Sequence, residues 1–315
     1  MRFGVVLEAF VDRTLDDTLE LLASTAPQVN ALEIGVGGFA PTPHCDAEHL
    51  LRDDSARRAW SNRIEERGFA VSALNVSGNP VDPDATVARR HDEDLRNAVR
   101  LAAALGVDRV VAMAGCPAGT TGDRTPHFDG GGWLPYLAGI GEQQWQDVVG
   151  PYWQETTEFA RREHPELLIC IELHPGTCAH NTETFERLAA ISDNVAANLD
   201  PSHLFWQRMD PLAVAAGLSR IGHAHAKDVV FNDDELALNG LLDRRWSPTD
   251  RGAPWTFAAV GRGHDAAWWT TFLSVLADRG VETISIEQED PTVPAEQGIA
   301  AAAALLASSI PAEVG

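Results

Sequence analysis

Positive charge, cysteine and long apolar runs are all scarce in this sequence of 315 residues. Lys and Arg together number 24 against 46 Asp and Glu, which gives a formal net charge of −22. Such a charge repels phosphate backbones, and the basic residues form no cluster larger than a pair of Arg, so we expect no nucleic-acid partner. No run of 18 apolar residues occurs, so we expect no transmembrane helix and no membrane partner.

Cysteine usage argues against a secreted disulfide scaffold. The four cysteines are Cys45, Cys116, Cys170 and Cys178, and none forms a CxxC motif. This spacing predicts neither a disulfide framework nor a zinc ribbon. The N-terminal stretch MRFGVVLEAFVD has a short apolar segment that Glu8 interrupts, which indicates a first strand rather than a signal peptide. We therefore expect a reducing, cytoplasmic setting.

Eight apolar segments recur along the chain, each followed by a helix-like stretch or a loop leading to one. They span residues 2–8, 29–36, 70–77, 108–115, 167–173, 195–200, 220–226 and 281–288. Near-continuous apolar strands that alternate with helices indicate parallel strands covered on their outer face. Eight such units predict a single (β/α)8 TIM barrel over residues 1–315. A doubly wound open sheet is the alternative, but no GxGxxG loop follows the first strand.

Two helices and two long connections can be placed within this pattern. Apolar residues recur at helical spacing in 86–105, and Gly106 stands where a helix ends. Asp265 can cap a second helix over 264–279. The long connections, 115–143 and 228–263, follow the fourth and seventh strands, at the end of the barrel where active sites form.

Four successive predicted strands place an acid or an imidazole near their C-terminal ends. These residues are Glu172, Asp200, the pair His223 and His225, and Glu287. A barrel would bring them to one point, where they would repel one another unless a divalent cation neutralised them. Three carboxylates and one imidazole suit Mn²⁺, Mg²⁺ or Co²⁺, with Zn²⁺ as a further candidate.

Each of these residues also has an ordinary structural explanation. Glu172 alone would be a salt-bridged or capping residue, and Asp200 before a proline would cap a helix. Glu287 could belong to an acidic surface run with Glu289 and Asp290. The two histidines are two residues apart and so point to the same side of their strand, where one could bind a metal while the other packs in the barrel.

The stretches IELHP, NLDPSHLFWQ, GHAHAKD, GRGH and SIEQED resemble the xylose isomerase-like (AP endonuclease family 2) TIM-barrel superfamily. The resemblance covers nearly the whole chain and is greatest to the sugar phosphate isomerase/epimerase branch. In sugar 3-epimerases of this superfamily, a Glu, an Asp, a His and a Glu hold one Mn²⁺, Co²⁺ or Mg²⁺ ion. The resemblance implies that Glu172, Asp200, His225 and Glu287 are these ligands, with Mn²⁺ first among the metals, and that His203 binds the substrate.

The sequence also departs from those epimerases. Cys178 and Phe231 stand where a substrate-binding Glu and Arg are expected, and His174 and Lys227 are available instead. The departures argue against simple epimerisation of free ketohexoses. Apart from a weak GRG at 261–263, no phosphate-binding signal is visible.

The resemblance implies an isomerase or epimerase in carbohydrate metabolism that acts on a ketose or keto-sugar through a metal-stabilised enediolate. Glu172 and Glu287 would exchange the proton from opposite sides of the metal. His203 and Lys227 would polarise substrate oxygens, although Lys227 could instead pair with Asp228.

A second hypothesis keeps the metal and changes the bond that breaks. GCPAG, with a downstream WQ and PYW, resembles the catalytic α subunit of C-glycoside deglycosidases, lyases that cleave 3-keto-C-glycosides by elimination. There a loop histidine assists, here His127, and histidine is a common general base. Those enzymes pair with a small β subunit, and a homo-oligomer is the other assembly left open. An AP endonuclease and a non-enzymatic accessory barrel are the remaining alternatives.

Overall fold

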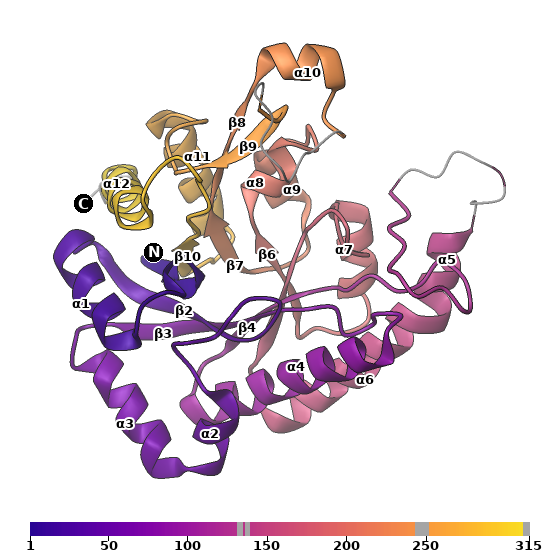
Figure 1. Cartoon of the computed structure of the whole chain (residues 1–315), viewed down its shortest axis with the longest axis horizontal. Helices are drawn as coiled ribbons and strands as arrows, with labels where there is room; N and C mark the ends of the chain where they lie inside the picture. The colour runs from indigo at the N-terminus through magenta and orange to yellow at the C-terminus, as the bar shows by residue number, and fades with distance from the viewer. Residues whose placement is uncertain (131–134, 136–138, 243–251, 311–315) are drawn as a thin grey trace.

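Eight parallel strands close into a barrel in the computed structural model of this protein, which describes residues 1–130, 135, 139–242 and 252–310 (Figure 1). The strands are β1 (Arg2–Val6), β2 (Val29–Gly38), β3 (Ala70–Ser77), β4 (Arg109–Met113), β5 (Leu168–Glu172), β6 (Val195–Leu199), β7 (Ile221–Ala226) and β10 (Thr283–Ile286). The first strand pairs with both β2 and β10, which closes the barrel. The predicted (β/α)8 fold is confirmed, and the open doubly wound sheet is wrong. The assignment of all of residues 1–315 to one domain stays a prediction.

Helices surround the barrel (Figure 1). They are η1 (Leu7–Phe10), α1 (Leu15–Thr25), α2 (Ala47–Arg52), α3 (Asp54–Glu65), α4 (Ala85–Leu105), α5 (Ile140–Gln144), η2 (Trp145–Val149), α6 (Gly150–Glu163), α7 (Thr182–Ala189), α8 (Pro201–Phe205), α9 (Pro211–Gly217), α11 (Ala266–Asp278) and α12 (Ala295–Ser308). Among the residues that the structure describes, no helix is both long and apolar enough to cross a bilayer.

Side-chain caps fix the ends of the two predicted helices. Asp84 accepts hydrogen bonds from the backbone of the first turn of α4, and Gly106 ends that helix in the left-handed conformation, with φ of 69°. Leu95, Val99 and Ala102 face the core from the same helix, as their spacing predicts. Asp265 caps α11 by accepting from the Trp268 backbone nitrogen at 2.9 Å. Both helices are confirmed.

The two long connections differ in their secondary structure. The described residues of 114–139 form no helix or strand, whereas the connection after β7 contains β8 (Asp228–Phe231), α10 (Asp233–Asn239) and β9 (Trp255–Ala258). The two short strands pair in antiparallel fashion and extend with α10 beyond the barrel (Figure 1). Trp255 stacks on Trp206 with ring centroids 4.7 Å apart, so the extension has an aromatic core of its own. Residues 131–134, 136–138 and 243–251 of these connections lie outside the described residues.

The inside of the barrel changes from small and apolar to polar along its axis. Ala73, Val111, Cys170 and Ala196 form a small cluster of their own, separate from the core under the helices. Cys170 is therefore a core residue, and all four cysteines are buried and free. Nearer the C-terminal ends of the strands the buried residues are polar: Glu33, Asn75, Asn198, His223, His225 and Ser285.

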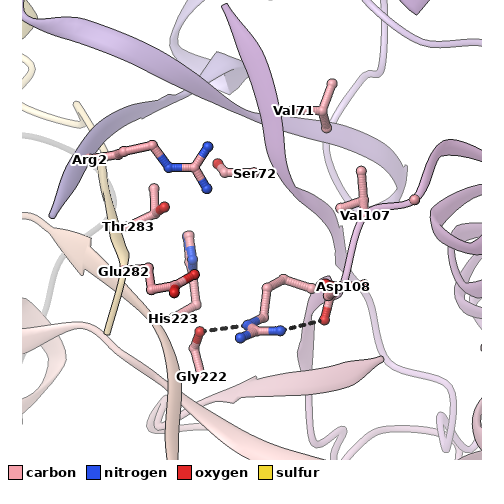
Figure 2. A pocket seen from close by; sticks show the side chains of 11 residues that line it. Arg2, Val71, Ser72, Val107, Asp108, Gly222, His223, Glu282 and Thr283 are labelled. Atoms are coloured by element: carbon pink, nitrogen blue, oxygen red, sulfur yellow. Dashed lines mark hydrogen bonds between the residues drawn. The ribbon is translucent and has the colours of Figure 1, made fainter. Parts of the chain in front are cut away.

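A cavity of about 130 Å³ opens at the N-terminal ends of the strands. Figure 2 shows Arg2, Asp108, Glu282 and His223 around it. The Arg109 side chain donates from Nε to the Gly222 carbonyl at 2.9 Å and from a terminal nitrogen to the Asp108 carbonyl at 2.9 Å. Barrel enzymes carry out their chemistry at the opposite end of the barrel, where an active site is therefore expected.

Gly222 tests how tightly the small cluster is packed. A Cβ at this position would lie 2.7 Å from Cys170 Sγ and 2.8 Å from Ala196 Cβ. We expect Gly222→Ala to lower the free energy of unfolding by about 1–3 kcal/mol, measured by urea denaturation, because the barrel interior has no room for the methyl group. Gly217→Ala is the control, since the nearest atom to its Cβ is 4.0 Å away. Equal stability of Gly222→Ala and the unchanged protein would contradict this packing.

Candidate active site

Three of the predicted metal ligands meet at the C-terminal end of the barrel. Glu172 is the last residue of β5, His225 lies near the end of β7, and Glu287 directly follows β10. The Nδ1 atom of His225 is 2.9 Å from Glu287 Oε2 and 3.5 Å from Glu172 Oε2. One atom from each residue lies within 4.8 Å of the other two, which is close enough for all three to hold one metal ion.

Asp200, the fourth predicted ligand, has two roles. Its Oδ1 accepts from the Ser202 backbone nitrogen at 2.8 Å and caps α8, so the ordinary explanation for this residue holds for one oxygen. Its Oδ2 lies 3.4 Å from His203 Nε2 and 3.1 Å from Lys227 Nζ. Burial would raise the pKa of Asp200, but the Lys227 ammonium, followed by His203, lowers it well below its usual value.

Lys227 joins Asp200 to the other three residues. Its Nζ is 2.8 Å from Glu287 Oε2 and 3.2 Å from Glu289 Oε2, besides its contact with Asp200. Burial would lower the pKa of Lys227, but Asp200 and Glu287 raise it well above its usual value, so the group is an ammonium ion. The alternative pairing with Asp228 is wrong. Asp228 instead accepts a hydrogen bond from His264 Nδ1 at 2.7 Å and bonds from the backbone of 261–264.

Two neutral histidines border this cluster. His203 Nε2 is 2.9 Å from Glu172 Oε1, and the rings of His203 and His174 are 4.1 Å apart. Burial, with the Lys227 charge, lowers the pKa of His203 to about 4. Burial, with the neighbouring His203, lowers the pKa of His174 to about 4 as well. Both rings can therefore hydrogen-bond to a ligand at neutral pH without adding charge.

The donor set fits a divalent cation. Asp200 Oδ2 and Glu287 Oε2 are buried, and within the described part of the chain neither accepts a hydrogen bond of good geometry, although both lie at ion-pair distance from Lys227. Buried polar atoms are seldom left in this way unless they serve another group. Carboxylate oxygens and an imidazole nitrogen are the ligands that Mn²⁺, Mg²⁺, Co²⁺ and Zn²⁺ accept.

The family described as "Xylose isomerase-like TIM barrel" matches residues 29–309. The chain belongs to this family. A relative from Bacillus subtilis (strain 168), "Uncharacterized protein YfiH", is 35% identical over 304 residues, which cover 95% of this chain and 96% of that protein.

Solved structures with low sequence identity share the family's fold. One is the probable 3-DHS dehydratase AsbF of Bacillus anthracis, with a TM-score of 0.67, 14% identity and coverage of 98% of this chain and 99% of that one. A second is the IOLI protein with a zinc atom, with a TM-score of 0.65, 17% identity and 98% coverage of both chains. A third is a D-tagatose 3-epimerase-like protein, with a TM-score of 0.63, 19% identity and coverage of 98% and 97%.

This member of the xylose isomerase-like family carries a second layer of buried polar residues that the sequence analysis missed. Glu33 of β2 lies at hydrogen-bond distance from both His225 and His223. Asn75 of β3 donates to Glu33 at 2.7 Å, and Asn198 of β6 donates to Glu172 at 3.1 Å. A lone acid in the apolar segment 29–36, and single amides in two other strands, were the available signals.

The two histidines of β7, His223 and His225, contact different groups. Both point to the same side of β7, as the spacing predicts, and both reach Glu33. His225 also reaches Glu172 and Glu287, whereas His223 turns to Ser285 at 3.0 Å. His225 is therefore the one placed to bind a metal.

The remaining predicted positions lie away from the cluster or on its edge. His127 is half-buried in the loop after β4, where its carbonyl accepts from Gln144 at 2.7 Å; within the described residues it makes no hydrogen bond or ion pair with the cluster. Cys178 is buried, and burial raises the pKa of its thiol to about 12. Glu8, in η1 directly after β1, was not predicted as a site residue. Burial, followed by the charge of Glu287, raises its pKa to about 7.

Lys227 holds the carboxylates together when no metal is present. We expect Lys227→Met to lower the free energy of unfolding by about 3–5 kcal/mol in EDTA, because Asp200 and Glu287 lose their buried partner. Mn²⁺ should restore more stability to this variant than to the unchanged protein. Lys227→Arg is the control that keeps the charge. Urea denaturation with and without Mn²⁺ measures both effects, and a Lys227→Met variant as stable as Lys227→Arg in EDTA would contradict the ion pair.

The two neutral histidines make stability depend on pH. The unfolded chain binds their protons below about 6.5, whereas the folded chain binds them only below about 4, so stability falls as pH decreases between these values. Between pH 7.5 and 5 each histidine contributes a loss of roughly 2 kcal/mol. The double variant His174→Asn/His203→Asn should therefore lose less stability over this range in EDTA, measured by urea denaturation. A variant of the exposed His49 is the control, and equal slopes for all three proteins would contradict the burial argument.

Proposed function

We propose that this protein is a divalent-metal-dependent isomerase or epimerase that moves a proton at a carbon next to the carbonyl of a ketose or keto-sugar. The observation that carries the proposal is the pair of carboxylates, Glu172 and Glu287, that lie 3.5 and 2.9 Å from His225 Nδ1 at the mouth of the barrel. The family supports it, and one solved structure of the same fold is named D-tagatose 3-epimerase-like.

Glu172, Asp200, His225 and Glu287 would hold one metal ion, with Mn²⁺ the first candidate and Mg²⁺, Co²⁺ and Zn²⁺ the others. A divalent cation in this position supplies positive charge that stabilises an oxyanion forming on the substrate. The IOLI structure of the same fold contains a zinc atom, which supports a metal in barrels of this kind.

The two glutamates differ in how firmly they are held. Glu172 is almost fully buried, with Oε1 facing His203 and Oε2 accepting from Asn198. The Glu287 side chain is 19% exposed and reaches both His225 and Lys227. In the proposed reaction one carboxylate removes the proton from one face of the carbon, and the other returns a proton to the second face for epimerisation. Proton transfer by a positioned side chain contributes roughly 10²–10⁴-fold to the rate of such reactions.

Lys227 and His203 would bind the substrate oxygens. The ammonium of Lys227 lies 4.6 Å from the centre of the Phe257 ring and reaches three carboxylates, so it is already held at the site. His203 lies between His174 and Phe257, which fixes its ring. Both groups can donate a hydrogen bond to an oxygen on which negative charge develops.

The elimination hypothesis stays a prediction, with its small β subunit. It assigns the general base to His127. The backbone of His127 bonds to the Pro117 carbonyl and to the Gln144 side chain. The homo-oligomer also stays a prediction.

Metal content is the first test of the proposal. Elemental mass spectrometry of the purified protein should find about one divalent metal per chain, and Glu172→Ala/Asp200→Ala should lose it. Proton transfer is then measured as deuterium uptake from D₂O into a panel of ketoses and 3-keto-glycosides by NMR. Glu172→Gln and Glu287→Gln should reduce uptake by roughly 10²–10⁴-fold. Glu282→Gln, at the opposite end of the barrel, is the matched control. A protein that binds no metal after reconstitution, or that keeps full uptake in both variants, would contradict the proposal.

A further inference from the structure

We propose that Glu33 is a positioning residue for the metal centre, because it fixes the orientation and the tautomer of His225 from the far side of the barrel interior. The inference rests on the proposed function, since it assumes that His225 binds a divalent cation together with Glu172, Asp200 and Glu287.

Glu33 reaches His225 across the barrel. The strand order around the barrel is β2, β1, β10, β7, so two strands separate Glu33 on β2 from His225 on β7. Even so, His225 Nε2 is 3.0 and 3.1 Å from the two carboxylate oxygens of Glu33. The other ring nitrogen, Nδ1, faces Glu287 at 2.9 Å. The two ends of one imidazole therefore serve two different groups.

This arrangement selects a tautomer. A carboxylate only accepts hydrogen bonds, so Glu33 requires a proton on His225 Nε2. The lone pair of a neutral ring is then on Nδ1, which points at Glu172 and Glu287. Histidines that bind metals generally donate their second N–H to a carboxylate or carbonyl, and loss of that partner weakens metal binding.

Glu33 is itself held from two sides. Asn75 Nδ2 donates to Oε1 at 2.7 Å, and His223 Nε2 lies 2.8 Å from Oε2. His223 Nε2 also lies 3.0 Å from Ser285 Oγ. Glu33 and Ser285 are 0% exposed, and the other two residues at most 4%. Glu33 is thus held in place by Asn75 and His223, as a residue that positions another must be.

Stability alone does not account for a carboxylate at this position. A buried ion pair is often no better for stability than well-packed apolar side chains of similar volume, because both charges must leave water. The interior is already apolar one layer further down, at Ala73, Val111 and Cys170. A charge retained directly behind the metal-facing histidine therefore indicates a role in the centre.

Glu33, His223 and His225 could instead be ligands of a second ion, since one atom from each lies within 4.8 Å of the others. The separations of 2.8–3.1 Å between their oxygen and nitrogen atoms are ordinary hydrogen-bond lengths. Asn75 and Ser285 also bond to the same groups, which completes a hydrogen-bonded network without an ion. We therefore favour one ion per chain.

The test compares Glu33→Gln with the unchanged protein. Mn²⁺ affinity is measured by isothermal titration calorimetry, after urea denaturation in EDTA has established that the variant is folded. We expect Glu33→Gln to bind Mn²⁺ roughly 10–100-fold more weakly. Asp290→Asn is the matched control, because Asp290 is also buried but bonds to Thr292 and the Ala259 backbone rather than to a proposed ligand. The Mn²⁺ affinity of Asp290→Asn should stay within about twofold of that of the unchanged protein, whereas the affinity of Glu33→Gln should fall.

Three outcomes would overturn the inference. If the unchanged protein binds one Mn²⁺ and Glu33→Gln binds it equally well, Glu33 does not position His225, while the proposed function stands. Two ions per chain, with one lost in Glu33→Gln, would make Glu33 a ligand. No metal in the unchanged protein would remove the proposed function and this inference together.

A second measurement covers the case in which Glu33→Gln does not fold. The unchanged protein, labelled with ¹⁵N-histidine and loaded with Zn²⁺, is studied by NMR, with His225→Asn used to assign the signals. A proton on Nε2 of His225 supports the inference. A proton on Nδ1 with the metal on Nε2 overturns it.

Discussion

The carboxylates at the mouth of this barrel can lie so close together only because positive charge lies between them. Asp200 and Glu287 share the ammonium of Lys227, and His225 lies between Glu33, Glu172 and Glu287. Without the Lys227 ammonium and the contacts with His225, burial would force protons onto the carboxylates or move them apart. This balance between buried negative and positive charge determines where the His225 ring and the Lys227 side chain lie at the strand ends.

The barrel supplies the geometry that makes the balance possible. Parallel strands bring their C-terminal ends to one place, so residues at the ends of β5, β6, β7 and β10 meet although Glu172 and Glu287 are 115 positions apart in the sequence. Behind them β2 and β3 contribute Glu33 and Asn75, whose bonds run toward the interior. Burial holds His174 and His203 neutral beside the charged groups. Fixed charges and neutral donors thus occupy separate positions in one site.

Much of this could be predicted from the sequence, since the signals are local. The eight apolar segments predicted the strands, because a buried parallel strand is apolar on both faces. Asp84, Gly106 and Asp265 fixed helix ends through bonds to their own neighbours in sequence. The acids and the histidine at the strand ends were found because regular spacing reveals which residues share an end of the barrel.

The parts that could not be predicted depend on contacts between distant segments. Glu33 bonds to a residue three strands away around the barrel, and no spacing rule connects them. The β8–β9 pair packs through Trp255 of β9, which stacks on Trp206, and Trp206 lies just after α8, outside the connection that contains these strands. Asp228 follows Lys227 directly in the sequence and is an obvious candidate partner. Only the fold shows that Lys227 pairs with Asp200, while Asp228 bonds to His264. The path of the loop around His127 likewise follows from Gln144, which bonds to several loop carbonyls at once.

Lys227 is the only lysine in the chain, beside 23 arginines, and its side chain is 2% exposed. Reagents that couple to lysine side chains therefore meet one buried amine, which already pairs with Asp200, Glu287 and Glu289. A dye or a solid support attached through other side chains would leave the cluster at the mouth of the barrel unmodified.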